Sequence, residues 1–232
     1  NNVSLGHRAR ESGSGSGYGC NVSIGNEAGR SMTSSHNVSI GNFAAAYRSD
    51  GTDNIFLGRY SGSNNTGQTG SFNFGAGYAV LGGSGSGGCN IAIGCAAGQK
   101  VTDGSFNILL GARAGFEITT GCKNILMGQC TGKCITTGYC NVFIGQGTGV
   151  GDAAITGYRN TVVGDCAGIG IEAGYLNAIF GHGAGNSIEN DIGNTLIGAC
   201  SGRNIRYQDN YNTFIGFGAG KLQQGGCGNV II

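Results

Sequence analysis

The chain has 232 residues, including 50 glycines, and it contains no proline or tryptophan. Only 11% of the residues are charged, well below the roughly 25% of ordinary soluble domains, and the formal net charge is +1. This balance excludes a general attraction to nucleic acid or to anionic membranes, and no segment is long and apolar enough to insert into a bilayer. A glycine-rich, weakly charged chain without a period would be typical of disorder, so its periodicity decides how it is interpreted.

One short phrase, Asn-x-x-(apolar)-Gly, recurs along the whole chain, with clear copies at Asn21–Gly25, Asn90–Gly94 and Asn107–Gly111. The glycines that close the phrase follow one another in steps of 16 to 19 residues, at Gly6, Gly25, Gly41, Gly58, Gly75, Gly94, Gly111, Gly128, Gly145, Gly164, Gly181, Gly198 and Gly216. A period near 17 residues predicts a solenoid in which each repeat is one coil stacked on the last. We therefore expect an all-β fold, a parallel β-solenoid of about 13 to 14 coils with roughly 17 residues per coil. We expect a single domain over residues 1–232 that is a segment of a longer fibre.

The residues before each closing glycine predict a short strand, and we count them backward from that glycine. Position −1 is large and apolar in every copy, as in Ile24, Ile93 and Ile144, and position −3 is mostly Val, Ile or Thr. Side chains alternate in a strand, so these two positions share a face, which we predict to be the inside of the coil. The glycines at the closing position and four residues later predict corners that need a positive φ or a close approach of coils.

Position −4 is asparagine in thirteen copies. The one exception is Ser71, in the copy whose closing glycine is Gly75. An asparagine repeated at one phase can donate to one neighbouring coil and accept from the other. We predict a structural asparagine ladder rather than a row of ligands. Its members are Asn21, Asn37, Asn54, Asn90, Asn107, Asn124, Asn141, Asn160, Asn177, Asn194 and Asn212.

Position −2 is predicted to face outward. It is serine in the first three copies and becomes large and apolar further along the chain. A strand that is apolar on both faces is normally buried on both, and soluble monomers avoid a continuous apolar stripe. We therefore predict an oligomer interface, most simply of three chains about one axis. Its residues are Leu109, Leu126, Phe143, Val162, Ile179, Leu196, Phe214 and Ile231.

Aromatic and cysteine residues also recur at shared phases. Tyr139, Tyr158 and Tyr175 occupy one phase in three consecutive coils, which predicts a stacked column that either stabilises packing or contacts a surface glycan. Of the ten cysteines, Cys122 and Cys140 lie at nearly matching phases of adjacent coils and are the candidate disulfide. Our expectation for the cysteines in general is that they act as small buried apolar residues, with a few disulfides within or between chains as the alternative.

Nothing in the sequence predicts an enzyme. There is no Cys-x-x-Cys and no paired histidine, so we expect no metal site and no cofactor. The acidic residues do not recur at one phase, and no nucleophile–base set is indicated, so we expect no catalytic residues.

The phrases Asn21-Val-Ser-Ile-Gly-Asn-Glu-Ala-Gly29 and Asn141-Val-Phe-Ile-Gly145 resemble the Asn-x-x-Ile-Gly-x-x-Ala-Gly repeat of phage tail-fibre-like proteins. They are also similar to the head repeats of trimeric autotransporter adhesins, which form a left-handed parallel β-roll of three chains. The resemblance implies a trimeric fibre, located extracellularly or on a virion surface, that extends or carries an attachment function.

Two other functions are compatible with the repeat. One is a subunit of an extracellular filament built by end-to-end self-association, and the other is a single-chain ice-binding solenoid. The second needs a regular threonine ladder, for which Thr119–Thr120 and Thr136–Thr137 supply too few residues.

Overall fold

The computed structural model describes residues 1–11, 19–48, 50–63, 68–151, 153–205, 209–223 and 226–232. The chain forms two compact units, Asn1–Thr120 and Gly121–Ile232, and each is described by itself. The expected single domain over residues 1–232 stays a prediction.

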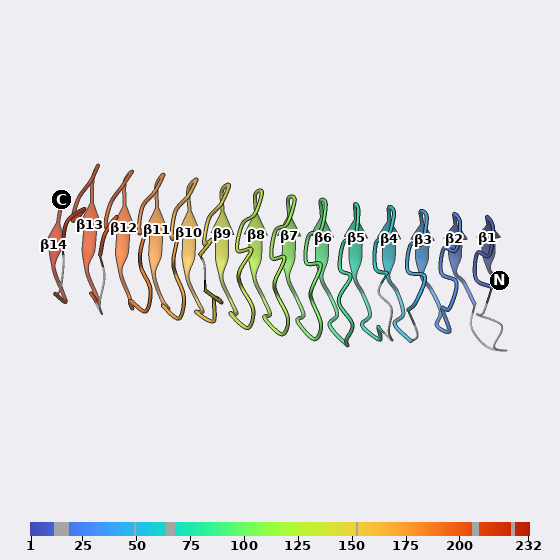
Figure 1. Cartoon of the computed structure of the whole chain (residues 1–232). Helices are drawn as coiled ribbons and strands as arrows, with labels where there is room; N and C mark the ends of the chain where they lie inside the picture. The colour runs from blue at the N-terminus through green and yellow to red at the C-terminus, as the bar shows by residue number, and fades with distance from the viewer. Residues whose placement is uncertain (12–18, 49, 64–67, 152, 206–208, 224–225) are drawn as a thin grey trace. The chain divides into compact units, whose positions relative to one another are not determined.

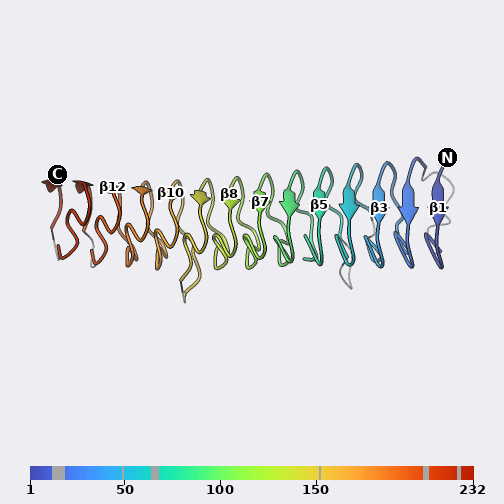
Figure 2. The same ribbon diagram turned by 90° about the horizontal axis from the view of Figure 1, so that it is seen from above.

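Among the described residues, each unit contains seven strands that pair in parallel and in chain order, one strand to a coil (Figures 1 and 2). The strands of the first unit are β1 (Val3–Leu5), β2 (Val22–Ile24), β3 (Val38–Ile40), β4 (Ile55–Leu57), β5 (Phe74–Ala76), β6 (Ile91–Ile93) and β7 (Ile108–Leu110). Those of the second unit are β8 (Ile125–Met127), β9 (Val142–Ile144), β10 (Thr161–Val163), β11 (Ala178–Phe180), β12 (Thr195–Ile197), β13 (Thr213–Ile215) and β14 (Val230–Ile231). The predicted parallel β-solenoid is confirmed. No helix that could cross a membrane occurs in the part of the chain that the structure describes.

The inner face of the strands is the opposite of the one predicted. Leu109, Leu126 and Phe143, at position −2, are fully buried, whereas Ile93 and Ile144, at position −1, are 43% and 36% exposed. The residues assigned to an oligomer stripe are therefore core residues, with Val162, Ile179, Leu196 and Phe214 also fully buried and Ile231 partly buried in the last strand. The serines at this position face inward too, since Ser23 and Ser39 have no exposed surface.

The asparagine at position −4 explains this choice of face. Alternation in a strand places positions −4 and −2 on the same side. The asparagines point inward, where their amides meet backbone groups of neighbouring coils, so position −2 must follow them. Apolar residues seven positions after the closing glycine, among them Ile118, Ile135 and Ile171, form the opposite wall of the core and are also fully buried.

In the fifth copy the closing glycine is Gly77, not Gly75. β5 pairs with β4 in the register Ile55↔Phe74, Phe56↔Gly75 and Leu57↔Ala76. Gly77 has the φ of +136° that the other closing glycines share. Asn73 is therefore the ladder residue of this coil, and Ser71 is no exception to the pattern.

Most closing glycines are required by both their backbone conformation and the neighbouring coil. Gly145, for example, has a φ of +132°, and a Cβ on it would lie 2.5 Å from the carbonyl oxygen of Gly164. Real Cβ atoms do not approach a backbone oxygen this closely, and L-residues rarely adopt this φ. Both predicted reasons for a glycine at this corner, the positive φ and the close approach of coils, therefore apply.

Candidate functional site

The asparagine ladder runs through the core of each unit. Within each unit, the backbone N–H of every ladder asparagine after the first donates to Oδ1 of the asparagine one coil earlier, at 2.8–3.1 Å. In most coils the side-chain Nδ2 donates to that same Oδ1 and to a turn carbonyl in the following coil. The turn carbonyl usually belongs to the glycine three residues before the next asparagine, such as Gly157 for Asn141.

Inside this network an asparagine amide has no capacity left for a ligand. Asn141 illustrates the pattern, because its Nδ2 donates twice, to Asn124 and Gly157, and its Oδ1 accepts twice, from the backbone and side chain of Asn160. Two donors and two acceptors are all that an amide offers. The predicted ladder residues lie in this network. It also includes Asn2 and Asn229, which belong to the thirteen copies but not to the predicted list, and Asn73, which the prediction missed. Asn73 could have been found from the phrase Asn73-Phe-Gly-Ala-Gly77, in which alanine replaces the larger apolar residue.

The outward face of the strands carries an apolar surface that we call the outward stripe, formed by the side chains at positions −3 and −1. In the first unit both columns are entirely apolar, and in the second unit the −3 column includes Thr161, Thr195 and Thr213. Neither column contains a charged residue in any strand. Side chains such as Ile93 and Ile197 are 43% and 40% exposed. The unpartnered apolar face inferred from the sequence thus exists, on the side of the strand opposite to the one predicted.

The predicted tyrosine column is present in the second unit. The ring centroids of Tyr139 and Tyr158 are 4.8 Å apart with an interplanar angle of 1°, and those of Tyr158 and Tyr175 are 4.7 Å apart at 6°. Stacked rings cover each other's faces, so the column presents mainly ring edges and hydroxyls to a partner. This geometry favours the packing role over a platform for sugar rings.

None of the ten cysteines, all of which lie among the described residues, takes part in a disulfide, so the candidate Cys122–Cys140 disulfide is absent. The two residues differ by one position in their coils, and the backbone N–H of Cys140 donates to the carbonyl of Cys122 at 3.0 Å. The phase partner of Cys122 is Tyr139 rather than Cys140. The expectation of small buried residues is also wrong, because Cys20, Cys89, Cys95 and Cys227 are exposed and the other six cysteines are partly exposed.

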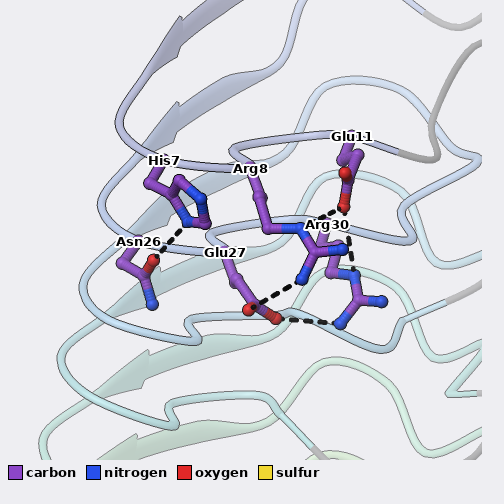
Figure 3. Close-up of polar contacts among 6 residues, drawn as sticks. All are labelled: His7, Arg8, Glu11, Asn26, Glu27 and Arg30. Atoms are coloured by element: carbon purple, nitrogen blue, oxygen red, sulfur yellow. Dashed lines mark hydrogen bonds and ion pairs between the residues drawn. The ribbon is translucent and has the colours of Figure 1, made fainter.

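Four charged residues on the first two coils form a compact network (Figure 3). Glu11 lies 2.8 Å from Arg8 and 3.6 Å from Arg30, and Glu27 lies 3.7 Å from Arg8 and 2.9 Å from Arg30. The hydrogen bond and the charge of Glu27 raise the pKa of Arg30. Beside them, Nδ1 of His7 lies 3.0 Å from Oδ1 of Asn26. The four charges cancel one another, so this cluster indicates a register contact between coils rather than an acid–base site.

Arg48 is a buried cation at the position, seven residues after the closing glycine, that isoleucine occupies in five other coils, at Ile118, Ile135, Ile171, Ile188 and Ile205. Its side chain is 3% exposed, and burial lowers its pKa to about 10. The guanidinium donates to Oε1 of Gln68 and to the carbonyl of Gly70, and it lies 4.9 Å from the ring centroid of Phe56. A cavity of about 20 Å³ beside it has room for one water molecule. Arg48 and Gln68 thus introduce polar groups into an otherwise apolar core wall.

Among the described residues, no group of three or more His, Cys, Asp or Glu side chains is placed to hold a metal ion.

Comparison with protein-family models, with curated protein sequences and with solved structures finds no match.

Proposed function

We propose that this chain is a non-catalytic structural subunit that assembles with copies of itself through the outward stripe. The observation that carries the proposal is the stripe itself, an uncharged and largely apolar surface that recurs on every strand of both units. Exposed apolar surface of this extent favours association, because its removal from water contributes about 25 cal/mol per Å².

A second copy of the chain is the partner that fits the stripe best. The side chains repeat at the spacing of parallel strands, about 4.8 Å. A partner with the same repeat can match its own columns to these at each coil, whereas an irregular surface would meet them only in places. Symmetric association of identical chains is also the commonest form of oligomer. Three chains about a common axis would close such an assembly, as in the fibres that the repeat resembles.

The resemblance of the repeat supports an attachment fibre located extracellularly or on a virion surface. In that role the solenoid acts as a spacer, because neighbouring coils stabilise one another and the length follows from the number of repeats. No feature of the asparagine ladder or of the charged cluster supplies a competing catalytic function.

Sedimentation equilibrium and light scattering on the purified chain test this proposal. We expect a mass of three chains, unchanged by a reductant because the cysteines are free. The double variant Ile144→Lys/Ile197→Lys places two charges on the outward stripe and should sediment as a monomer. The matched control, Gln146→Lys/Ala199→Lys, adds the same charges two residues later in the same coils and should assemble normally. Circular dichroism checks that both variants fold.

A wild-type monomer at about 100 μM would contradict the proposal, since a specific interface should persist at that concentration. Assembly that survives in the stripe variant would also contradict it. Electron microscopy adds a separate outcome, in which filaments of indefinite length would favour end-to-end self-association instead.

A further inference from the structure

Three aromatic residues lie on neighbouring coils of the first unit, just after β3, β4 and β5. Phe43 and Tyr60 stack with ring centroids 5.2 Å apart and an interplanar angle of 12°. Tyr78 is turned away from this stack, at 6.1 Å and 84° from Tyr60. Tyr78 follows its closing glycine by one residue, whereas Phe43 and Tyr60 follow theirs by two, and this accounts for its different orientation. The side chain of Tyr78 is 50% exposed.

These rings line an open depression of about 450 Å³, together with Tyr47, Ser63 and Gln99. The depression combines aromatic rings with hydroxyl and amide groups. Such a mixture is typical of sites that take a ligand with one apolar face and several polar substituents.

Arg59 lies against two of the rings that line this depression and adds a positive charge beside it. Its guanidinium carbon lies 5.0 Å from the ring centroid of Tyr60 and 5.9 Å from that of Tyr78, within the range of cation–π contacts. The described residues include no carboxylate in an ion pair with Arg59, whereas nearby Lys100 is paired with Glu117 at 2.6 Å. The charge on Arg59 is therefore available to a ligand.

We infer that this depression binds an acidic saccharide. The C–H face of a pyranose ring packs on an aromatic ring, whose face carries the negative part of the ring quadrupole, and Tyr78 provides such a face. The carboxylate of a uronic or sialic acid pairs with Arg59, because a guanidinium matches a carboxylate in charge and geometry. Ser63, Gln99 and the Tyr47 hydroxyl are the hydrogen-bonding partners for the sugar hydroxyls.

A single-stranded nucleic acid is a weaker candidate for the same groups. Bases also stack on aromatic rings, but such sites need a positively charged groove along the backbone. The chain has a net charge of only +1, and one unpaired arginine does not make a groove. The inference does not depend on the proposed oligomer, because these residues lie in the turns after the strands and not on the outward stripe.

Saturation-transfer NMR with three probes tests the inference on the full chain. Tetragalacturonate should bind with a dissociation constant on the order of 1 mM, as expected for a shallow site. The neutral maltotetraose should bind at least tenfold more weakly. Tetrathymidylate should bind no better than maltotetraose.

Two variants locate the site, and two others control for charge and ring content. Arg59→Gln should remove the preference for the acidic sugar, and Tyr78→Ala should remove transfer to both sugars. Arg113→Gln deletes an exposed arginine two coils beyond Tyr78, and Tyr139→Ala alters the other tyrosine column, so both should bind like wild type. Thermal unfolding by circular dichroism verifies the fold of each variant. The inference is overturned by equal binding of the two sugars, by an equal loss in a control variant, or by tighter binding of tetrathymidylate.

Discussion

The ring of Phe56 in β4 packs against Gly75, its partner in β5. A Cβ built on Gly75 would lie 2.8 Å from Cδ1 of Phe56, and one on Gly62 in the same coil as Phe56 would lie 2.6 Å from the ring. The largest side chain of the inner column in the first unit is thus accommodated by two glycines. In this pair, the large side chain of one coil is compensated by the glycine of the next coil.

Gly75→Ala should therefore destabilise the first unit. Its φ is outside the left-handed region, so an alanine backbone fits and the cost comes from overpacking against Phe56, about 1–3 kcal/mol. Urea denaturation measures the loss. In the double variant Gly75→Ala/Phe56→Leu the smaller side chain makes room for the new methyl group, so the combined loss should be smaller than the sum of the two single losses. Additive losses would show that the two residues are not coupled through packing.

Two glycines of one coil allow the cost of backbone crowding to be measured apart from the cost of a positive φ. Gly145→Ala combines an unfavourable φ with a Cβ 2.5 Å from the oxygen of Gly164 and should cost about 2–5 kcal/mol. Gly147→Ala has a φ of +60° and no neighbour nearer than 3.8 Å, so it should cost only about 1–2 kcal/mol. Denaturant unfolding of the pair makes the comparison, and equal losses would refute the close-approach explanation.

Removal of one ladder asparagine should be costly. Asn141→Ala leaves the buried N–H of Asn160 and the carbonyl of Gly157 without this partner, at about 1–3 kcal/mol for each group. The expected loss of unfolding free energy is about 2–5 kcal/mol. Gln146→Ala, an exposed change in the same coil, should lie within about 0.5 kcal/mol of wild type. A small loss in Asn141→Ala would mean that water replaces the ladder.

The turn around Asp103 should weaken at low pH. Its Oδ1 accepts hydrogen bonds from the backbone N–H and the hydroxyl of Ser86, at 3.0 and 2.9 Å, and these bonds lower the pKa of Asp103. A carboxyl group with a lowered folded pKa contributes stability above its unfolded pKa of about 3.9, and this contribution is lost as the pH falls through the folded value. An NMR titration should show a higher Asp103 pKa in Ser86→Ala, and an unchanged pKa would contradict this assignment.

The sequence by itself determined the solenoid, its period, the glycine corners and the asparagine ladder, because each depends on one residue type returning at one phase. Only the tertiary structure decided which face is inside, because strand alternation is symmetric when both faces are apolar. The inward asparagines and the wall that includes Ile118 and Ile135 close the coil on the side of position −2.

The tertiary structure likewise decided the register at Gly77, where the strand pairing identified the closing residue. It also brought Phe43 and Tyr60, two residues after their closing glycines, together with Arg59 and Tyr78, which follow theirs by one residue. Periodicity identifies columns of like residues, whereas contacts between unlike positions of neighbouring coils depend on how the turns place the side chains.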